Sequence, residues 1–271
     1  MPSLLSRRLA LGVEAPTAPS VAELYHVNTA LQPNSPLGGW PPEHISADEE
    51  AAMAGAGRRF STATQRRLPP PAPLPLPLGE ALAQRRTRRR FAPGPLDLST
   101  LATLLGASAG LTGEETLPSG ALRPLRAAPS AGGLYPVELY VVARSVASLP
   151  AGIYHYAPRA HALEELSRGD PIEALSKACF YGDSLRQSSL VVLYGLALGR
   201  TLRKYGDRGY RYALLDLGHL AQNMALVAEG LGLGMMTTCG YYDDRLHALL
   251  GLDGLEEAIL YLAYLGPRAA P

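Results

Sequence analysis

The spacing of apolar residues predicts helices along much of the chain after residue 78. Residues 79–89 can form a helix, and Asp97 can cap a second one whose buried face carries Leu98, Leu101, Leu104 and Leu105. Residues 210–231 form a longer helical pattern that is apolar on nearly all sides and ends at glycines. We expect this long helix at the centre of the fold or at an interface between subunits.

Short runs of β-branched and aromatic residues predict strands between and after these helices. A hairpin is expected around Pro158, because strand-like runs lie on both sides of it. The predicted strands cover residues 138–143, 153–156, 162–166, 189–198, 235–239 and 258–265. Helices and strands are therefore interleaved, and the sequence contains no internal repeat.

The first part of the chain differs from the rest in its residue composition. Residues 1–67 mix proline, glycine, alanine and charged residues, with a helix expected near residues 47–59 and the single tryptophan, Trp40, in a turn. Residues 68–78 are rich in proline, which favours an extended path. We therefore predict an N-terminal arm (1–67), a proline-rich linker (68–78) and a folded domain (79–271).

Composition narrows the classes of function. The 271 residues are 47% apolar, enough for a buried core, and their formal net charge is +1. A charge this close to zero gives no general attraction to nucleic acid or to a charged membrane surface. Cys179 and Cys239 are the only cysteines, which excludes a disulfide framework and a cysteine-based zinc site. With no apolar signal segment or membrane span in the sequence, we expect a cytoplasmic protein that binds neither nucleic acid nor membrane.

Two adjacent glycines follow a small hydroxyl residue in the segment PSAGGLYPVELY. Gly132 and Gly133 have no Cβ, so the backbone there can lie against a planar ring, while Ser130 and the loop amides offer hydrogen bonds to the edge of that ring. Taken alone, the segment is more simply an ordinary turn before a strand. The rest of the chain has to decide between these interpretations.

A cluster of arginines offers a site for an anion. The segment RRTRRRF is expected to place Arg85 and Arg89 one helical turn apart, with Thr87 between them in sequence. These groups can converge on one oxyanion, and each charge-assisted hydrogen bond from a guanidinium contributes roughly 1.5–3 kcal/mol. The alternative is a solvated basic face. Nucleic-acid binding is disfavoured because no aromatic stacking platform accompanies the arginines.

Two later segments also suggest chemistry. MMTTCGYY ends a predicted strand at a Gly240 turn, which can direct backbone amides at a ligand or can simply turn the chain; Cys239 there has the character of a small buried residue. RKYGDRGYR sets Lys204 and Tyr205 side by side among arginines. Neighbouring positive charges and removal from water both favour a neutral, basic lysine, so this pair is a candidate for proton abstraction. A solvated loop is the alternative.

Two motif-like strings do not fit their context. GASAG at residues 106–110 follows a helical pattern rather than a strand, so Ser108 is not expected to be a nucleophile. Asp216 and His219 stand three residues apart without a third ligand, so we expect no metal site and a buried, hydrogen-bonded His219.

These segments occur together in a fixed order. They are RRTRRRF, PSAGGLYPVELY, GIYHYAP, RKYGDRGYRYALLDLGHLAQN, LGLG followed by MMTTCG, and LYLAYLG. As an ordered set, from about residue 78 to residue 266, they resemble the SagB-type dehydrogenases of the flavin-dependent nitroreductase superfamily. The resemblance implies an α+β, nitroreductase-like fold with a central, mostly antiparallel sheet flanked by helices. It also implies a homodimer with a long buried interface helix and two FMN sites at the interface.

The resemblance also implies roles for individual residues. The phosphate and ribityl contacts of FMN correspond to Arg85, Arg86, Thr87 and Arg89. The loop beside the flavin ring, commonly donated across the dimer, corresponds to Ser130, Ala131, Gly132 and Gly133. The segment near the N5 edge of the flavin corresponds to Thr238, Cys239 and Gly240. Lys204 and Tyr205 look like the Lys-Tyr pair associated with catalysis in azole-forming members. Many members carry basic phosphate ligands beyond the last strand, where Arg268 is the only candidate in this sequence.

The activity implied is FMN-dependent oxidation of thiazoline or oxazoline rings, in a peptide natural-product precursor, to thiazoles or oxazoles. Lys204 or Tyr205 would take the proton. The substrate would be an azoline-bearing peptide, free or carrier-bound. Because no cyclodehydratase portion is evident, it would be delivered either by the N-terminal arm or by a partner such as a cyclodehydratase or an assembly-line protein. An NAD(P)H-dependent nitro- or ene-reductase and a flavin-free scaffold subunit of a biosynthetic complex are the alternatives.

Overall fold

The computed structural model describes residues 20–30, 46–55 and 57–270, and the chain divides into two compact units, Met1–Glu43 and His44–Pro271. In the first unit, helix α2 (Val21–Asn28) begins with a capping box: the Glu23 amide donates to the Ser20 hydroxyl, and the Ser20 amide donates to the Glu23 carboxylate. The predicted turn at Trp40 lies outside the described residues.

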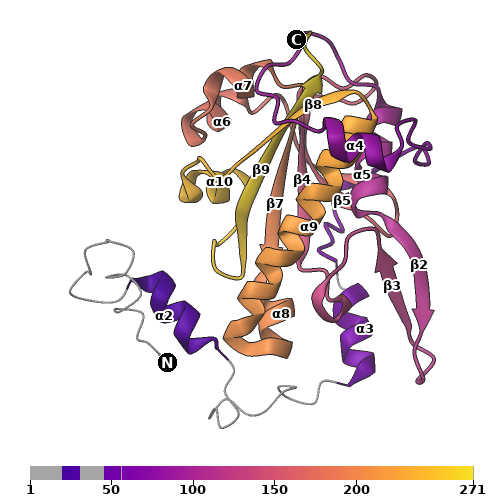
Figure 1. Cartoon of the computed structure of the whole chain (residues 1–271), viewed down its shortest axis with the longest axis vertical. Coiled ribbons are helices and arrows are strands. Elements are labelled where there is room, and N and C mark those ends of the chain that lie inside the picture. Colours follow the sequence, from indigo (N-terminus) through magenta and orange to yellow (C-terminus); the bar gives the residue numbers. More distant parts are fainter. Residues whose placement is uncertain (1–19, 31–45, 56, 271) are drawn as a thin grey trace. The chain divides into compact units, whose positions relative to one another are not determined.

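The second unit is built on a seven-stranded sheet with the order β1-β6-β5-β4-β7-β9-β8, in which every pairing is antiparallel (Figure 1). Its strands are β1 (Thr64–Arg67), β4 (Val137–Ala143), β5 (Gly152–Ala157), β6 (Ala162–Arg168), β7 (Leu190–Ala197), β8 (Leu233–Thr238) and β9 (Glu257–Pro267). A separate hairpin joins β2 (Leu111–Thr116) to β3 (Leu122–Arg126).

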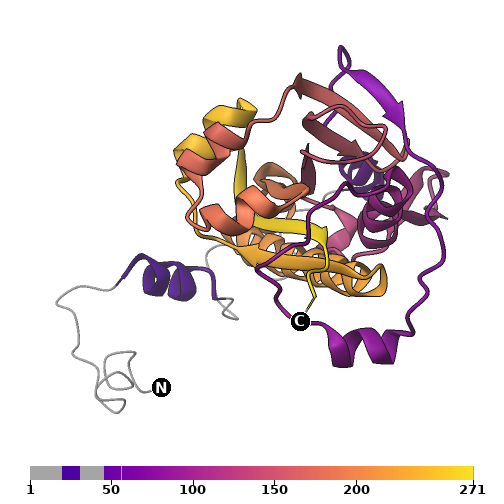
Figure 2. The ribbon, with the colours of Figure 1, turned by 90° about the horizontal axis from the view of Figure 1, so that it is seen from above.

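Helices cover both faces of the sheet. One face packs against α5 (Leu98–Ala109) and α9 (Gly209–Gly230), and the other against the group α6 (Ile172–Ala178), α7 (Gly182–Gln187) and α10 (Asp243–Leu250) (Figures 1 and 2). Because side chains alternate along a strand, β4 supplies Leu139 and Val141 to one core and Tyr140 and Val142 to the other. Three shorter helices complete the unit: α3 (Ala47–Gly55), α4 (Leu78–Gln84) and α8 (Leu198–Tyr205).

The predicted α+β fold with a mostly antiparallel sheet between helices is confirmed, as are the six predicted strands and the long helix, which is α9. Asp97 stands at the N-cap of α5, although its side chain makes no capping hydrogen bond. The helix expected over residues 79–89 is wrong in its second half. It ends at Gln84, since the Arg88 amide donates to the carbonyl of Met235 in β8, so pairing with the sheet replaces another helical turn.

Part of the predicted arm lies within the second unit. Strand β1 pairs with β6, and α3 also belongs to this unit. The proline-rich segment that follows is tied to α5, because the Ala72 amide donates to the Thr103 hydroxyl at 2.9 Å. A methyl group built on Gly106 would lie 2.3 Å from Pro71 Cγ, so the glycine in α5 permits this close approach.

Within the described ranges, no helix combines the length and the apolar character needed to cross a membrane.

Candidate functional site

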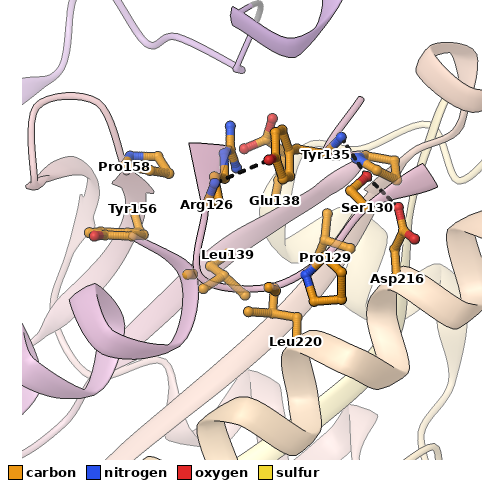
Figure 3. A pocket seen from close by; sticks show the side chains of 14 residues that line it. Arg126, Pro129, Ser130, Tyr135, Glu138, Leu139, Tyr156, Pro158, Asp216 and Leu220 are labelled. Atoms are coloured by element: carbon orange, nitrogen blue, oxygen red, sulfur yellow. Dashed lines mark hydrogen bonds between the residues drawn. The ribbon is translucent and has the colours of Figure 1, made fainter. Parts of the chain in front are cut away.

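The glycine loop, residues 129–135, is held closed by hydrogen bonds to helix α9. The Ser130 hydroxyl and the Ala131 amide both donate to the carboxylate of Asp216, and the Tyr135 amide donates to the Ser130 hydroxyl oxygen at 2.8 Å (Figure 3). Asp216 is 5% exposed. Burial raises the pKa of this carboxyl, while the bonds from Ser130 and Ala131 act in the opposite direction. The loop conformation is therefore fixed by the protein's own groups.

Gly132 is the point where the predicted catalytic pair meets this loop. Its φ of 63° lies in the left-handed region, and a methyl group built on it would lie 2.6 Å from the Tyr205 hydroxyl oxygen and 2.9 Å from Lys204 Nζ. Lys204 Nζ also lies 5.3 Å from the centroid of the Tyr205 ring. Both residues end helix α8, so the solvated loop considered for residues 203–211 is wrong. The chain there continues from α8 into α9 through a short 3-10 turn.

A cavity of about 400 Å³ lies behind the glycine loop (Figure 3). Most of its wall is apolar and includes Leu139, Tyr156 and Leu220, while Ser130 and Arg126 contribute polar groups. The Arg126 guanidinium lies 4.7 Å from the centroid of the Tyr135 ring, and the Arg126 amide donates to the Tyr135 hydroxyl at 3.1 Å. Tyr135 is thus bonded at both its backbone and its side chain, which accounts for its positive φ of 46°.

A buried ionic cluster supports the loop from the sheet. Arg200 donates to the Tyr135 carbonyl at 2.7 Å and forms an ion pair with Glu138. His155 lies between two carboxylates, 3.0 Å from Glu138 and 2.9 Å from Glu164, and is fully buried. Sequence patterns missed this cluster because its members lie on different strands and one helix.

The charges of this cluster determine its protonation. Burial alone would raise the pKa of Glu138, but the hydrogen bond to His155 and the charge of Arg200 lower it to about 2. Burial alone would likewise lower the pKa of His155, but the bonds and charges of Glu138 and Glu164 raise it overall. Both pKa shifts favour a charged His155 beside a charged Glu138.

The predicted phosphate contacts line a different cavity, of about 300 Å³. Arg85, Arg86 and Thr87 contribute to its wall, together with Thr237 at the end of β8. Arg89, in contrast, is exposed and does not line this cavity, since the chain is extended after Gln84 and the expected helical spacing is absent.

A buried carboxylate, Glu229 of α9, also lines this cavity. Its Oε1 lies 2.8 Å from Arg268 and 3.6 Å from Arg88. The late basic residue Arg268 is therefore engaged by an acid of its own chain. Neither Glu229 nor Arg88 was recognised from sequence, because α9 and residue 88 meet only in the folded chain.

The segment Thr238, Cys239 and Gly240 forms a tight turn at the end of β8. The Gly240 amide donates to the Thr238 hydroxyl at 2.8 Å, and the Phe180 amide donates to the Gly240 carbonyl at 3.0 Å. Cys239 is exposed, contrary to the expected buried residue, and partial burial and the nearby charge of Asp243 raise the pKa of its thiol. Its side chain is therefore a poor nucleophile.

The predicted site residues fall into two groups in one chain. Lys204 and Tyr205 meet the glycine loop at Gly132, whereas Arg85 to Thr87 share a cavity with Thr237, next to the turn at Thr238. His219 is exposed, so the expectation of a buried histidine is wrong; its neighbour Asp216 is the buried partner of the glycine loop. The described residues contain no cluster of three or more histidine, cysteine or acidic side chains arranged for a metal ion.

Comparison with known proteins gives two processing proteins and a protein assigned as a nitroreductase. The microcin B17-processing protein McbC of Escherichia coli is 33% identical over 144 residues, which cover 51% of this chain and 53% of McbC. The trifolitoxin-processing protein TfxB of Rhizobium leguminosarum bv. trifolii is 30% identical over 177 residues, covering 62% of this chain and 46% of TfxB. The chain thus matches about half the length of each processing protein. A protein of Methanocaldococcus jannaschii assigned as a nitroreductase is 33% identical over 171 residues, covering 63% of this chain and 82% of that protein.

Solved structures agree in fold. A protein from Anabaena variabilis, also assigned as a nitroreductase, superposes with a TM-score of 0.69 at 24% identity, over 94% of this chain and 49% of that one. The E. coli microcin synthetase McbBCD complex with truncated pro-MccB17 bound gives a TM-score of 0.56 at 24% identity, over 97% of this chain and 87% of that one. The nitroreductase family model matches residues 82–266, more than half of the sequence, and the chain therefore belongs to the nitroreductase family.

Proposed function

We propose that this protein is an FMN-dependent dehydrogenase that oxidises thiazoline or oxazoline rings in a peptide precursor to thiazoles or oxazoles. The observation that carries the proposal is the meeting of Lys204 Nζ and the Tyr205 hydroxyl at Gly132, where a methyl group would lie within 3 Å of both. The two candidate bases thus reach the backbone of the loop at a residue whose lack of a side chain leaves room for them.

The residues present fit a flavin phosphate and a flavin ring. The cavity beside Arg85, Arg86 and Thr87 offers two guanidinium groups and a hydroxyl, which suits a phosphate, and the carboxylate of Glu229 in the same wall is paired with Arg268. Gly132 and Gly133 both have positive φ, a conformation that ordinary side chains rarely adopt, so the loop exposes backbone there beside Lys204 and Tyr205. Thr237 and the turn after it lie next to the arginine cavity.

The reaction removes one proton and one hydride from adjacent ring atoms of the azoline. FMN, when bound, supplies the acceptor for the hydride and its two electrons. Lys204 or Tyr205 takes the proton, and the choice depends on which of them lies closer to the acidic carbon-hydrogen bond of the ring. The bonds from Ser130 and Ala131 to Asp216 keep the loop in place during this transfer. Help from a general base contributes about 100- to 10,000-fold to the rate.

A homodimer would unite the two groups of residues. Ser130 of the loop and Arg85 to Thr87 line separate cavities of one chain, and this supports a site that takes the loop from one subunit and the arginines from the other. Helix α9 exposes Leu214 and Leu215, with 40% and 58% of their surfaces accessible. Apolar residues at these positions support α9 as the interface helix.

The relatives support a peptide substrate and a biosynthetic partner. McbC and TfxB are named as processing proteins of microcin B17 and trifolitoxin, and the McbBCD complex was solved with a truncated pro-peptide bound. We therefore propose that an azoline-bearing peptide reaches this enzyme from a cyclodehydratase or an assembly-line partner, in the cytoplasm.

The deciding experiment incubates the purified yellow protein with an azoline-bearing peptide and measures the peptide mass. Loss of two hydrogens per ring is expected. K204A or Y205F, whichever removes the base, should bind flavin normally and lose at least about 100-fold in turnover. K177A is the control, since Lys177 is the only other lysine in the chain and is exposed. Full oxidation by both K204A and Y205F would contradict the assignment of the base.

An NAD(P)H-dependent nitro- or ene-reductase is the second candidate, favoured by the family match and by the M. jannaschii relative. Steady NAD(P)H oxidation with nitro or quinone acceptors, together with no mass change in any azoline peptide, would establish it. A colourless protein that binds no added FMN, and whose R85Q variant still supports peptide processing, would instead indicate a scaffold subunit.

A further inference from the structure

A pocket of about 420 Å³ next to the glycine-loop cavity is lined by four arginines and by no acidic residue. The arginines are Arg58, Arg59, Arg126 and Arg159, and the remaining wall is formed by Gly55, Gly57, Leu111, Pro124, Ala157 and Pro158. Arg126 and Pro158 also line the cavity of Figure 3, so the two spaces adjoin. The arginine pocket is distinct from the cavity beside Arg85 to Thr87.

The positive charge in this pocket is only partly balanced. Arg58 forms an ion pair with Glu257, which lies outside the wall. The Arg159 side chain is 52% exposed and lies 3.5 Å from the Glu114 carboxylate, which is a long distance for an ion pair. In the part of the chain that the structure describes, no ion pair or hydrogen bond engages the side chain of Arg59.

Arg126 is the most constrained of the four. Its Nε is buried and has no hydrogen-bond partner among the described residues. Burial and the nearby charge of Arg200 lower the pKa of its guanidinium, whereas Glu138 acts in the opposite direction. A buried donor without a partner costs free energy that a bound acceptor would recover. Because the Arg126 guanidinium is packed over the Tyr135 ring, its position is already fixed before an acceptor binds.

We infer that this arginine pocket binds an oxyanion, a carboxylate or a phosphate carried by a small ligand. Guanidinium groups are planar donors that match both kinds of oxyanion, and several in one concave site favour a ligand with more than one negative charge. A surface for nucleic acid fits less well, because the wall of the pocket contains no aromatic side chain for stacking. The inference is independent of the azoline chemistry.

Isothermal titration calorimetry of the purified full-length protein tests this inference, with inorganic phosphate and with glutarate as separate probes. We expect the wild-type protein to bind at least one probe. R59Q/R159Q should bind it at least about tenfold more weakly, because two charged donors are lost. R159Q alone should give a smaller loss in the same direction. The probe that binds shows whether the pocket prefers phosphate or carboxylate.

Two controls isolate the pocket. R186Q is matched to R159Q, since Arg186 is 54% exposed and lies 3.6 Å from Glu173, outside the pocket. R90Q removes an exposed arginine that lines neither this pocket nor the cavity beside Thr87, and it should leave this binding unchanged. Circular dichroism on every variant confirms folding. No binding of either probe at about 10 mM, equal binding by R59Q/R159Q, or an equal loss in R186Q or R90Q would overturn the inference.

Discussion

The glycine loop and the arginine segment, residues 85–89, differ in how much of their structure is set before any ligand arrives. The loop is closed by bonds from Ser130 and Ala131 to Asp216, and Arg200 holds the Tyr135 carbonyl from behind. In the arginine segment, the Arg86 side chain donates to the carbonyls of its neighbours Ala83 and Arg85 and to no other described residue, and Arg89 is exposed. The loop is thus held by its side chains and its backbone, whereas the segment is fixed at Arg88 by β8 and Glu229 and exposes the side chains of Arg86 and Arg89.

This difference predicts different consequences of mutation. Changes around the loop should alter the shape of the site or the stability of the domain, because the loop shares its bonds with the buried core. Changes in the arginine segment should alter ligand affinity and leave the unliganded fold intact, since exposed substitutions away from packed features shift stability by less than about 0.5 kcal/mol.

The largest effect is expected at His155, which supports the loop through Glu138 and Arg200. H155Q leaves the buried carboxylates of Glu138 and Glu164 without their shared cation, so we expect the free energy of unfolding to fall by about 3–5 kcal/mol. H219Q is the control, because His219 is exposed. Urea unfolding measures the free energy of unfolding of both variants. An H155Q protein as stable as H219Q would show that the loop does not depend on this cluster.

The same variant tests the pH dependence of this support. The raised pKa of His155 adds stability that is complete below the unfolded value of 6.5 and is lost as pH rises through the folded value. The lowered pKa of Glu138 adds stability above 4.5 that is lost as pH falls toward about 2. Wild type should therefore lose stability on going from pH 6 to pH 9, and H155Q should lack this particular loss.

An intermediate effect is expected at the two glycines of the loop. G132A and G133A both place a methyl group at a φ near 65°, which costs each about 1–2 kcal/mol. Only at Gly132 does the methyl also displace Lys204 and Tyr205; at Gly133 the nearest atom is Arg123 Cδ at 3.5 Å. Thermal unfolding should be similar in the two variants. Azoline oxidation by G132A should be at least about 100-fold slower than that by G133A. Equal activities of the two variants would show that the contact at Gly132 does not position Lys204 and Tyr205 for catalysis.

The smallest effect is expected in the arginine segment. R85Q should weaken FMN binding about tenfold, since one charge-assisted hydrogen bond partly open to solvent is lost. R90Q is the control, because Arg90 is exposed and does not line the cavity beside Thr87. Titration of the flavin fluorescence measures the affinity for FMN. Without flavin, R85Q and R90Q should have the same thermal unfolding temperature. A destabilised R85Q would show that the segment is part of the packed structure after all.

Local patterns were enough for most of the fold. The strand at residues 138–143 is recognisable because β-branched and apolar residues follow one another where both faces are buried, and α9 is recognisable from its periodicity. Helices α6, α7 and α10 were not anticipated, since they are only six to eight residues long and give a weak periodic signal. The extended path after Gln84 also escaped prediction, because it depends on the pairing of Arg88 with β8.

The amino-acid sequence by itself determined which segments could serve the site: the paired glycines at 132 and 133, the Lys204-Tyr205 pair, and the arginines of residues 85–89. It could do so because residue type and short spacing carry their chemistry. Only the tertiary structure decided that Asp216 closes the loop from 86 residues away, that Thr237 rather than Thr238 faces the arginines, and that His219 points outward. Those outcomes depend on which face of a strand or helix the core covers, and that choice is made by contacts between segments far apart in the chain.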